Sequence, residues 1–220
     1  VANNIDSVQG GTTSAHFGGA VEFNGGGITT TGDQVYSGAV TLSSAAAATS
    51  TNGGNITFNS TVNGAQDFAV NSPTGSITFN AAVGGNAALN SLSIDPTLIN
   101  INADISTVGD QNYGLDNILL GGNVTLTSTA GDIIVGGDID GANYTFGINN
   151  AGSNSSLDGI ISNVSAFTKS GSGFLLVDGA NTFTGNTTIN GGTLAIASNS
   201  AAGSGTITAN NGTTLQVIGG

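Results

Sequence analysis

The sequence predicts an all-β protein that folds as a parallel β-helix, a solenoid of stacked coils with about 20 residues in each coil. Three observations predict this fold: short runs that alternate apolar and polar residues, a repeat of about 20 residues, and a charged share of only 6%. With 220 residues, the chain is long enough to bury a substantial core in one such solenoid.

The alternation is clearest in three runs at residues 56–58, 77–79 and 124–126, which read Ile-Thr-Phe, Ile-Thr-Phe and Val-Thr-Leu. Alternation of apolar residues with Thr is typical of strands, and Gly, Asn and Asp separate these runs as turn residues do. A disordered low-complexity chain is the alternative. The hydrophobic share of 38%, ordered in this way, argues against it.

The repeat decides between the architectures that short strands can build. Gly-Asn-Ile-Thr-Phe-Asn at 54–59 returns at 75–80 as Gly-Ser-Ile-Thr-Phe-Asn. Thr-Leu-Ala-Ile at 193–196 returns after the same interval, at 214–217, as Thr-Leu-Gln-Val. A period of this length fits one coil of a β-helix. An antiparallel sandwich also has short strands, but it does not explain a fixed period.

The charge content fits stacked coils as well. The chain has one Lys or Arg and 13 Asp or Glu, which gives a net charge of −12. Stacked coils place like residues above like, so charges would repel, whereas stacked Thr or Asn can form hydrogen bonds. Gly and Asn suit the corners, where positive φ is often needed. The motif Gly-Asp-Gln-x-Tyr at 32–36 is also repeated over a longer interval, at 109–113.

The composition also excludes several classes of function. A protein that follows nucleic-acid phosphates needs several Lys or Arg residues, so we expect no nucleic-acid partner. The absence of Cys excludes a disulfide framework and a thiolate metal site. The longest strongly apolar run, at 174–177, is far too short to cross a bilayer, so we expect no membrane insertion by this segment.

The last quarter of the chain carries a dense set of regularly spaced residues. They are Lys169, Gly171, Gly173, Leu175, Val177, Gly179, Asn181, Phe183, Gly185, Thr187, Ile189, Gly192 and Leu194. This pattern resembles the autotransporter-associated β-strand repeat of bacterial passenger domains. Residues 20–140 resemble, more loosely, the Gly-Asp-Gln-x-Tyr and Ile-Thr-Phe-Asn repeats of haemagglutinin-like bacterial adhesins.

The resemblance implies a right-handed parallel β-helix on or beyond the cell surface. We expect a single domain. Adhesin-like repeats would occupy residues 1–166, and the autotransporter-associated repeat would continue the same solenoid over 167–220.

Catalytic groups are scarce. Parallel β-helices also host polysaccharide lyases and hydrolases, but a lyase typically needs a base beside the substrate carboxylate. Lys169 is the single candidate, and the repeat pattern explains it as a structural position. His16, the single histidine, has no nucleophile motif near it and is expected to be exposed or to cap a strand. We therefore expect no enzymatic activity and no organic cofactor.

Three carboxylates are the first candidates for a metal site. Asp132, Asp138 and Asp140 fall within nine positions, and the last two share one face of a strand. Such hard oxygen ligands suit Ca²⁺, although calcium-binding nonapeptide repeats and EF-hand spacing are both absent. The alternative is that these residues cap turns and keep the rod soluble through their charge.

Phe174 and Leu176 are the candidates for an interaction surface. If Leu175 and Val177 face inward, Phe174 and Leu176 face outward, where apolar pairs cover a neighbouring loop or contact another chain. Outward Thr residues at 125–129 raise ice binding as a separate hypothesis. The Thr rows are not regular from coil to coil, and Thr is common on outward strand faces.

Together these patterns predict an extracellular structural or adhesive stalk of a large bacterial surface or matrix protein, secreted or displayed at the cell surface. The expected partners are the chain itself, end to end or side by side, and a host or matrix surface, with a glycan as a further candidate. The alternative is a self-assembling filament subunit, because an uncapped solenoid exposes strand edges that can join end to end.

Overall fold

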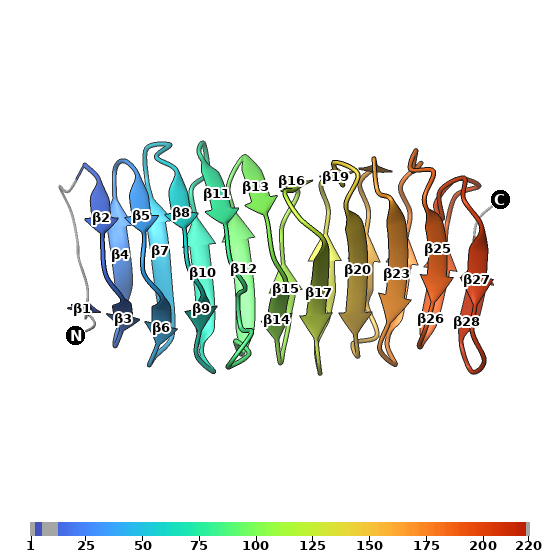
Figure 1. The fold of residues 1–220 in the computed structure, drawn as a ribbon, viewed down its shortest axis with the longest axis horizontal. Coiled ribbons are helices and arrows are strands. Elements are labelled where there is room, and N and C mark those ends of the chain that lie inside the picture. Colours follow the sequence, from blue (N-terminus) through green and yellow to red (C-terminus); the bar gives the residue numbers. More distant parts are fainter. Residues whose placement is uncertain (1–2, 6–12, 219–220) are drawn as a thin grey trace.

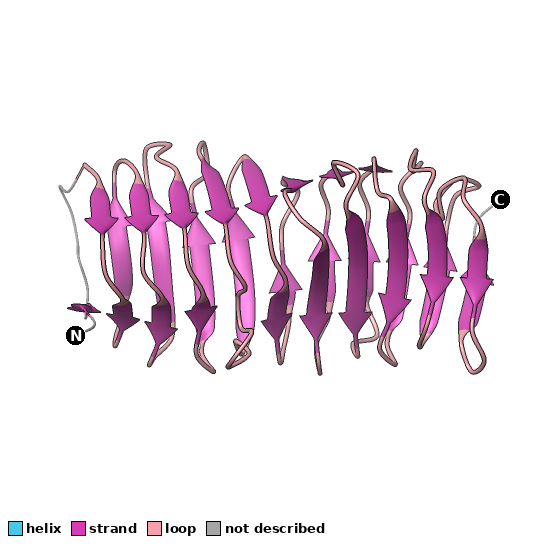
Figure 2. Ribbon diagram, in the orientation of Figure 1, coloured by secondary structure: helices cyan, strands magenta, loops and turns pink. Residues whose placement is uncertain are grey.

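The computed structural model describes residues 3–5 and 13–218, and these residues build one rod of stacked coils (Figure 1). They form 28 short β-strands and no helix (Figure 2). Within this described part, accordingly, no helix has the length and hydropathy needed to cross a membrane. Neighbouring strands pair in parallel, which confirms the β-solenoid, with about 10 turns and roughly 21 residues in each turn.

The strands belong to three sheets that follow the axis of the rod. Sheet A contains β1 (Asn3–Ile5), β3 (Val21–Phe23), β6 (Val40–Leu42), β9 (Val62–Asn63), β14 (Ile105–Thr107), β17 (Val124–Ser128), β20 (Thr145–Asn150), β23 (Ala166–Ser170), β25 (Asn186–Ile189) and β27 (Ile207–Ala209). Between β9 and β14 the sheet narrows to single bridges through Val83.

Sheet B is one uninterrupted ladder of ten strands. It contains β4 (Gly27–Thr30), β7 (Ala46–Ser50), β10 (Asp67–Asn71), β12 (Ser91–Asp95), β15 (Gln111–Asn112), β18 (Ile133–Val135), β21 (Ser155–Leu157), β24 (Phe174–Val177), β26 (Thr193–Ile196) and β28 (Thr214–Val217).

Sheet C is shorter. It contains β2 (Ala15–Phe17), β5 (Gln34–Tyr36), β8 (Ile56–Phe58), β11 (Ser76–Phe79), β13 (Leu98–Ile101), β16 (Asn117–Leu120), β19 (Ile139–Asp140) and β22 (Ile161–Ser162). Each full coil visits sheets B, C and A in that order. After β22 the chain still visits sheets A and B, but residues 178–185 and 197–206 cross the third side without a strand.

The sequence repeats coincide with the pairing register. Ile56 pairs with Ile77, and Thr193 pairs with Thr214, each at the interval that the repeats predict. Each residue therefore lies above its counterpart in the next coil, at the strand spacing of about 4.8 Å.

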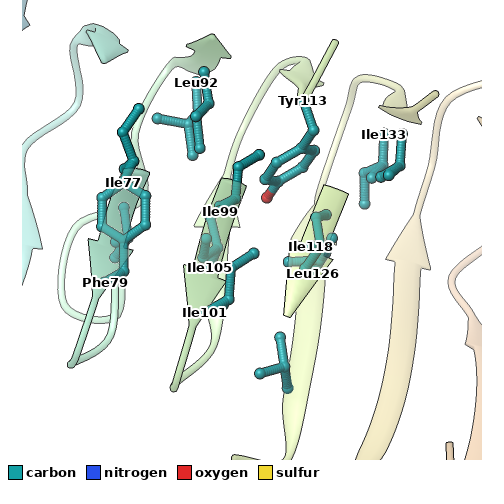
Figure 3. Close-up of a cluster of buried hydrophobic side chains, with 14 of the residues drawn as sticks. Ile77, Phe79, Leu92, Ile99, Ile101, Ile105, Tyr113, Ile118, Leu126 and Ile133 are labelled. Atoms are coloured by element: carbon teal, nitrogen blue, oxygen red, sulfur yellow. The ribbon is translucent and has the colours of Figure 1, made fainter. Parts of the chain in front are cut away.

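The core consists of inward columns, one residue from each coil. Phe17, Tyr36, Phe58 and Phe79 stack along sheet C with ring centroids 5.1, 4.7 and 5.1 Å apart. Aliphatic residues continue the column, beginning with Ile101, which pairs with Phe79. Figure 3 shows Phe79 and Ile101 among the buried side chains of neighbouring coils. Continuous burial along the rod, rather than a compact centre, stabilises each coil against its neighbours.

Glycines mark the corners where backbones of successive coils approach most closely. A Cβ added at Gly54 would lie 2.0 Å from the carbonyl carbon of Gly32 in the preceding coil. Since Gly75 packs on Gly54 in the same way, a column of glycines at this corner lets the coils stack without a gap.

Candidate functional site

Asp and Asn side chains at the corners link each coil to the next. The backbone N–H of Asn55 donates to Asp33 Oδ1 (2.7 Å), and that of Ser76 donates to Asn55 Oδ1 (2.9 Å). Other corners repeat this arrangement, in which the acceptors are Asn63, Asp104, Asp110, Asn117, Asn123, Asp132, Asp138 and Asn186. At most of these corners the side-chain oxygen thus satisfies an N–H at or just before the start of a strand, as a cap does in other turns.

The three calcium candidates belong to this corner system. Asp132 precedes a strand of sheet B, whereas Asp138 and Asp140 lie at sheet C, so the structure separates Asp132 from the other two. The N–H of Ala142 and the side-chain amide of Asn163 donate to Asp140 Oδ1, and they lower the pKa of its carboxyl group. In the described part of the chain, no three His, Cys, Asp or Glu residues lie together as metal ligands would.

Asp138 and Asp140 border a hollow of about 410 Å³ on the outer side of sheet C, beside Leu119 and Ile160. No basic side chain lines it. His16 is exposed on β2 in the first coils, as expected, far along the rod from this hollow. The hollow therefore offers two carboxylates with no basic side chain in its lining.

Lys169 lies in the interior of the solenoid. It occupies the inward column of sheet A that holds Ile148 before it and Ile189 after it, and its side chain is 0% exposed. Its Nζ donates to the carbonyl oxygens of Ser170 (2.6 Å), Gly171 (3.2 Å) and Gly191 (3.3 Å). Burial lowers the pKa of this amine to about 8. Since Gly191 belongs to the next coil, Lys169 ties two coils together and is not available to a substrate.

Asn181 performs a similar role on the third side of the rod. Its Oδ1 accepts the N–H of Ile161 in the preceding coil, and its Nδ2 donates to the carbonyl of Ala201 in the following coil. Thr187 Oγ1 donates to the carbonyl of Ala202 (2.9 Å). We call Lys169, Asn181 and Thr187 the polar clamps, because each is buried and bonds to the backbone of another part of the stack.

The polar clamps coincide with a known repeat. Residues 167–196 match the passenger-associated-transport-repeat family. This confirms, for this segment, the resemblance to autotransporter passenger repeats. Neither the comparison with curated proteins nor the comparison with solved structures gives a match.

The repeat's other positions are structural too. Leu175 and Val177 face inward and are 0% and 1% exposed, as the pattern predicts. Phe174 and Leu176 lie on the outer side of sheet B, half-buried, in register with Thr193 and Ala195 of the next coil. A contact of Phe174 and Leu176 with a partner stays a prediction.

Sequence reasoning missed the role of the repeated Gly-Asp-Gln-x-Tyr motif. Tyr36 donates through its hydroxyl to Gln34 Oε1 (2.7 Å), and Gln34 Nε2 donates to Thr30 Oγ1 and to the carbonyl of Thr49. Tyr113 and Gln111 repeat these bonds with Thr107 and Thr127. Burial raises the pKa of both tyrosines.

The two copies occupy different corners. The first lies between sheets B and C, and the second between sheets A and B, where Figure 3 shows the hydroxyl of Tyr113 inside the core. The interval between the two copies is not a whole number of coils, and this was the signal that could have placed the second copy at another corner. The same kind of buried polar network therefore serves two different corners of the solenoid.

Proposed function

We propose that this chain is a rigid, non-enzymatic spacer of a bacterial passenger protein, secreted or displayed at the cell surface, with a structural or adhesive role. The β-solenoid and the passenger-associated repeat together fit an autotransporter passenger domain. The observation that carries the proposal is the unbroken stack: the parallel ladder of sheet B continues from β4 to β28, and the buried core runs from Val21 to Ala201.

The contacts between neighbouring coils also support the role of a spacer. A coil contacts only its neighbours, so the rod transmits force through backbone ladders and clamps in series. The net charge of −12 and the polar outer sides keep such a rod from associating non-specifically. Lys169 is buried and bonded to three backbone carbonyls, which supports a structural rather than a catalytic role for this amine.

Two measurements test the proposal. Antibodies against residues 13–218 should label intact producing cells, and protease added outside should remove the signal; a signal that appears only after lysis would refute the extracellular location. Single-molecule stretching of the chain from both ends should give a rod that unfolds in coil-sized steps. A chain that extends at negligible force would refute the mechanical role.

A second candidate is a filament subunit that joins end to end. The observation in its favour is β28, whose residues Leu215 and Val217 continue the inward column of sheet B yet are 37% and 67% exposed. A further coil from another copy would cover them. Light scattering over a concentration series distinguishes the filament from the spacer. The mass of a filament would grow in steps of one chain, and Leu215→Lys would block this growth. A spacer would keep one mass at all concentrations.

A further inference from the structure

The corner between sheets C and A changes its construction where sheet C ends. Ala142, Asn143 and Asn163 have φ values of 46°, 68° and 52°, and they are the three non-glycine residues with positive φ in the described part of the chain. All three belong to two successive corners between sheets C and A. Backbone strain of this kind concentrates at functional sites, and it persists only where the surroundings enforce it.

A cavity of about 350 Å³ opens at this place. Its floor is apolar and buried, formed by Val164 and Phe183, which are 2% and 1% exposed. Its rim is polar and exposed, and consists of Asn143, Asn163, Ser165, Thr182 and Thr184. This volume falls at the lower end of the range of about 300–1,000 Å³ that small-molecule sites occupy.

Two of the rim side chains, those of Asn143 and Thr184, have no structural hydrogen bond within the described part of the chain, unlike Asp and Asn side chains at other corners. At other corners of sheet A, Asp104, Asn123 and Asn186 give their Oδ1 to the N–H of the next coil. Among the described residues, no hydrogen bond engages the side chains of Asn143 or Thr184. The amide of Asn143 and the hydroxyl of Thr184 therefore do not hold the coils together and are available to a ligand.

Tyr144 adds an exposed aromatic residue that is next to the rim in the chain, although it is not among the residues that line the cavity. It follows Asn143, its carbonyl accepts the N–H of Ser165 (2.9 Å), and its side chain is 39% exposed. An exposed aromatic ring offers an apolar face next to hydroxyl and amide groups, which suits a ligand with both apolar and hydroxylated faces.

We propose that this corner, which we call the rim site (Asn143, Tyr144, Asn163, Ser165, Thr182 and Thr184), binds a neutral saccharide. Amide and hydroxyl groups pair with sugar hydroxyls, and the ring of Tyr144 covers the apolar face of the sugar. The proposal rests on the extracellular role proposed above, since a saccharide partner would be met outside the cell, and it names the ligand class of that role.

Charge favours a neutral sugar over an acidic one. No Lys, Arg or His lines the cavity, and the carboxylate of Asp140 accepts a hydrogen bond from Asn163 Nδ2 (3.0 Å) at its edge. A uronate or sialic acid would therefore meet a negative site in a chain of net charge −12.

The outer side of sheet A extends the site for a longer oligosaccharide. Thr168 and Thr188 lie outward in register on β23 and β25, which begin beside the cavity and run downward from it in Figure 1. Ser170 lies further along β23. Oligosaccharides should therefore bind more tightly than monosaccharides, through weak contacts added along the strands.

The chain carries a built-in probe for the test. It has three Tyr and no Trp, and Tyr36 and Tyr113 are 0% exposed, so acrylamide reaches only the fluorescence of Tyr144. Cello-, chito- and mannotetraose at up to about 10 mM are added to the 220-residue chain. We expect at least one of them to protect Tyr144 from quenching, and a tetragalacturonate of the same length to protect it less.

Two variants decide whether the rim site is responsible. Asn143→Gly keeps the positive φ while it removes the amide, and Thr184→Val removes one hydroxyl at constant shape. The double variant should weaken protection about tenfold or more, whereas Thr57→Val, an outward residue on β8, should leave it unchanged. An unchanged melting temperature shows that the variants are folded.

Protection equal in the double variant and the parent, or by none of the neutral tetrasaccharides, would overturn the proposal. Stronger protection by the tetragalacturonate would overturn its neutral specificity. These failures leave cell-surface labelling and the rod mechanics unaffected, so they are distinguishable from a failure of the spacer function.

Discussion

The coils up to β22 and the coils built by residues 166–217 close the third side of the rod in different ways. In the first region sheet C supplies a backbone ladder, as in the pairing of Ile77 with Ile99. In the second region no strand occupies that side, and Asn181 bonds instead to the coil before it and the coil after it. A solenoid therefore needs hydrogen bonds between coils on each side, but it does not need them to come from strands.

The difference has a consequence for the sequence. Backbone ladders accept any side chain that fits the inward or outward pattern, so coils built from them can diverge freely. Side-chain clamps demand a particular amide, amine or hydroxyl at a particular position. The three clamps Lys169, Asn181 and Thr187 all fall within residues 167–196, which match the repeat family.

The largest expected effect comes from removing the central clamp. Asn181→Ala leaves a buried N–H of Ile161 and a buried carbonyl of Ala201 without partners, and should lower the free energy of unfolding by about 4 kcal/mol. Urea denaturation measures the loss. Hydrogen exchange should locate it in residues 178–206, because each coil depends only on its neighbours.

Asn190→Ala is the matched control for the clamp. Asn190 is exposed, and its Oδ1 accepts a hydrogen bond only from Asn210 Nδ2 (2.7 Å). The change should cost about 0.5 kcal/mol or less. If both Asn variants lose equal stability, the clamp is no stronger than a surface ladder, and the contrast between the two regions disappears.

The second effect concerns the buried networks of the first region. Gln34→Ala and Gln111→Ala each leave a buried tyrosine hydroxyl without its acceptor, and should each lower the free energy of unfolding by about 3 kcal/mol. Because Gln111 repeats all the bonds of Gln34 except the one to the carbonyl of Ile28, the two losses should agree within about 1 kcal/mol. Urea denaturation of both variants tests this, with Thr57→Val as an outward control. A large loss at only one corner would mean that the surrounding sheets, not the network, set the stability.

Much of the first region could be predicted from the sequence. The interval between Ile56 and Ile77 gives the pairing register, since inward residues recur once in each coil. The pattern of the repeat family that the sequence resembles also placed Leu175 and Val177 in the core. The pairing register follows from periodicity, which depends on side-chain direction and not on detailed contacts.

The polar groups could not be placed in the same way. The sequence shows Lys169 at a repeat position, but its carbonyl ligands lie in the corner after it and in the next coil, and backbone atoms leave no mark in a sequence. Asp132, Asp138 and Asp140 are close along the chain, yet the chain turns a corner between the first and the second. Proximity in sequence predicts proximity in space only within one strand of a solenoid.

The third effect is the pH dependence of the clamp at Lys169. Its pKa is lowered to about 8 in the folded chain, while an unfolded lysine titrates near about 10.4. Between these values the folded chain has lost a proton that the unfolded chain keeps, so stability should rise with pH, by about 1 to 3 kcal/mol.

Above about pH 10 the trend should reverse, because unfolded tyrosines ionise while burial raises the pKa of Tyr36 and Tyr113. Urea denaturation at a series of pH values from about 7 to about 11 measures both limbs. In Lys169→Met, the rise in stability between about pH 8 and about pH 10 should be lost, whereas the fall in stability at higher pH should remain. A rise that persists in Lys169→Met would show that another group is responsible.

The smallest effect shows whether a corner carboxylate acts as a hydrogen-bond acceptor or through its negative charge. Asp138 Oδ1 accepts the N–H of Ile160 (2.8 Å), and an amide oxygen can accept the same bond. Asp138→Asn should therefore change the free energy of unfolding by less than about 0.5 kcal/mol, whereas Asp138→Ala should lower it by about 1 kcal/mol. Thermal melting with and without Ca²⁺ completes the test, and we expect no shift, since the carboxylate is used by the backbone and Asp132 lies at another sheet. A calcium-dependent rise that Asp138→Asn removes would reverse this assignment and make the corner a metal site. A nearly silent Asn substitution would instead show that these corners, unlike the clamps, require only an oxygen at the right place.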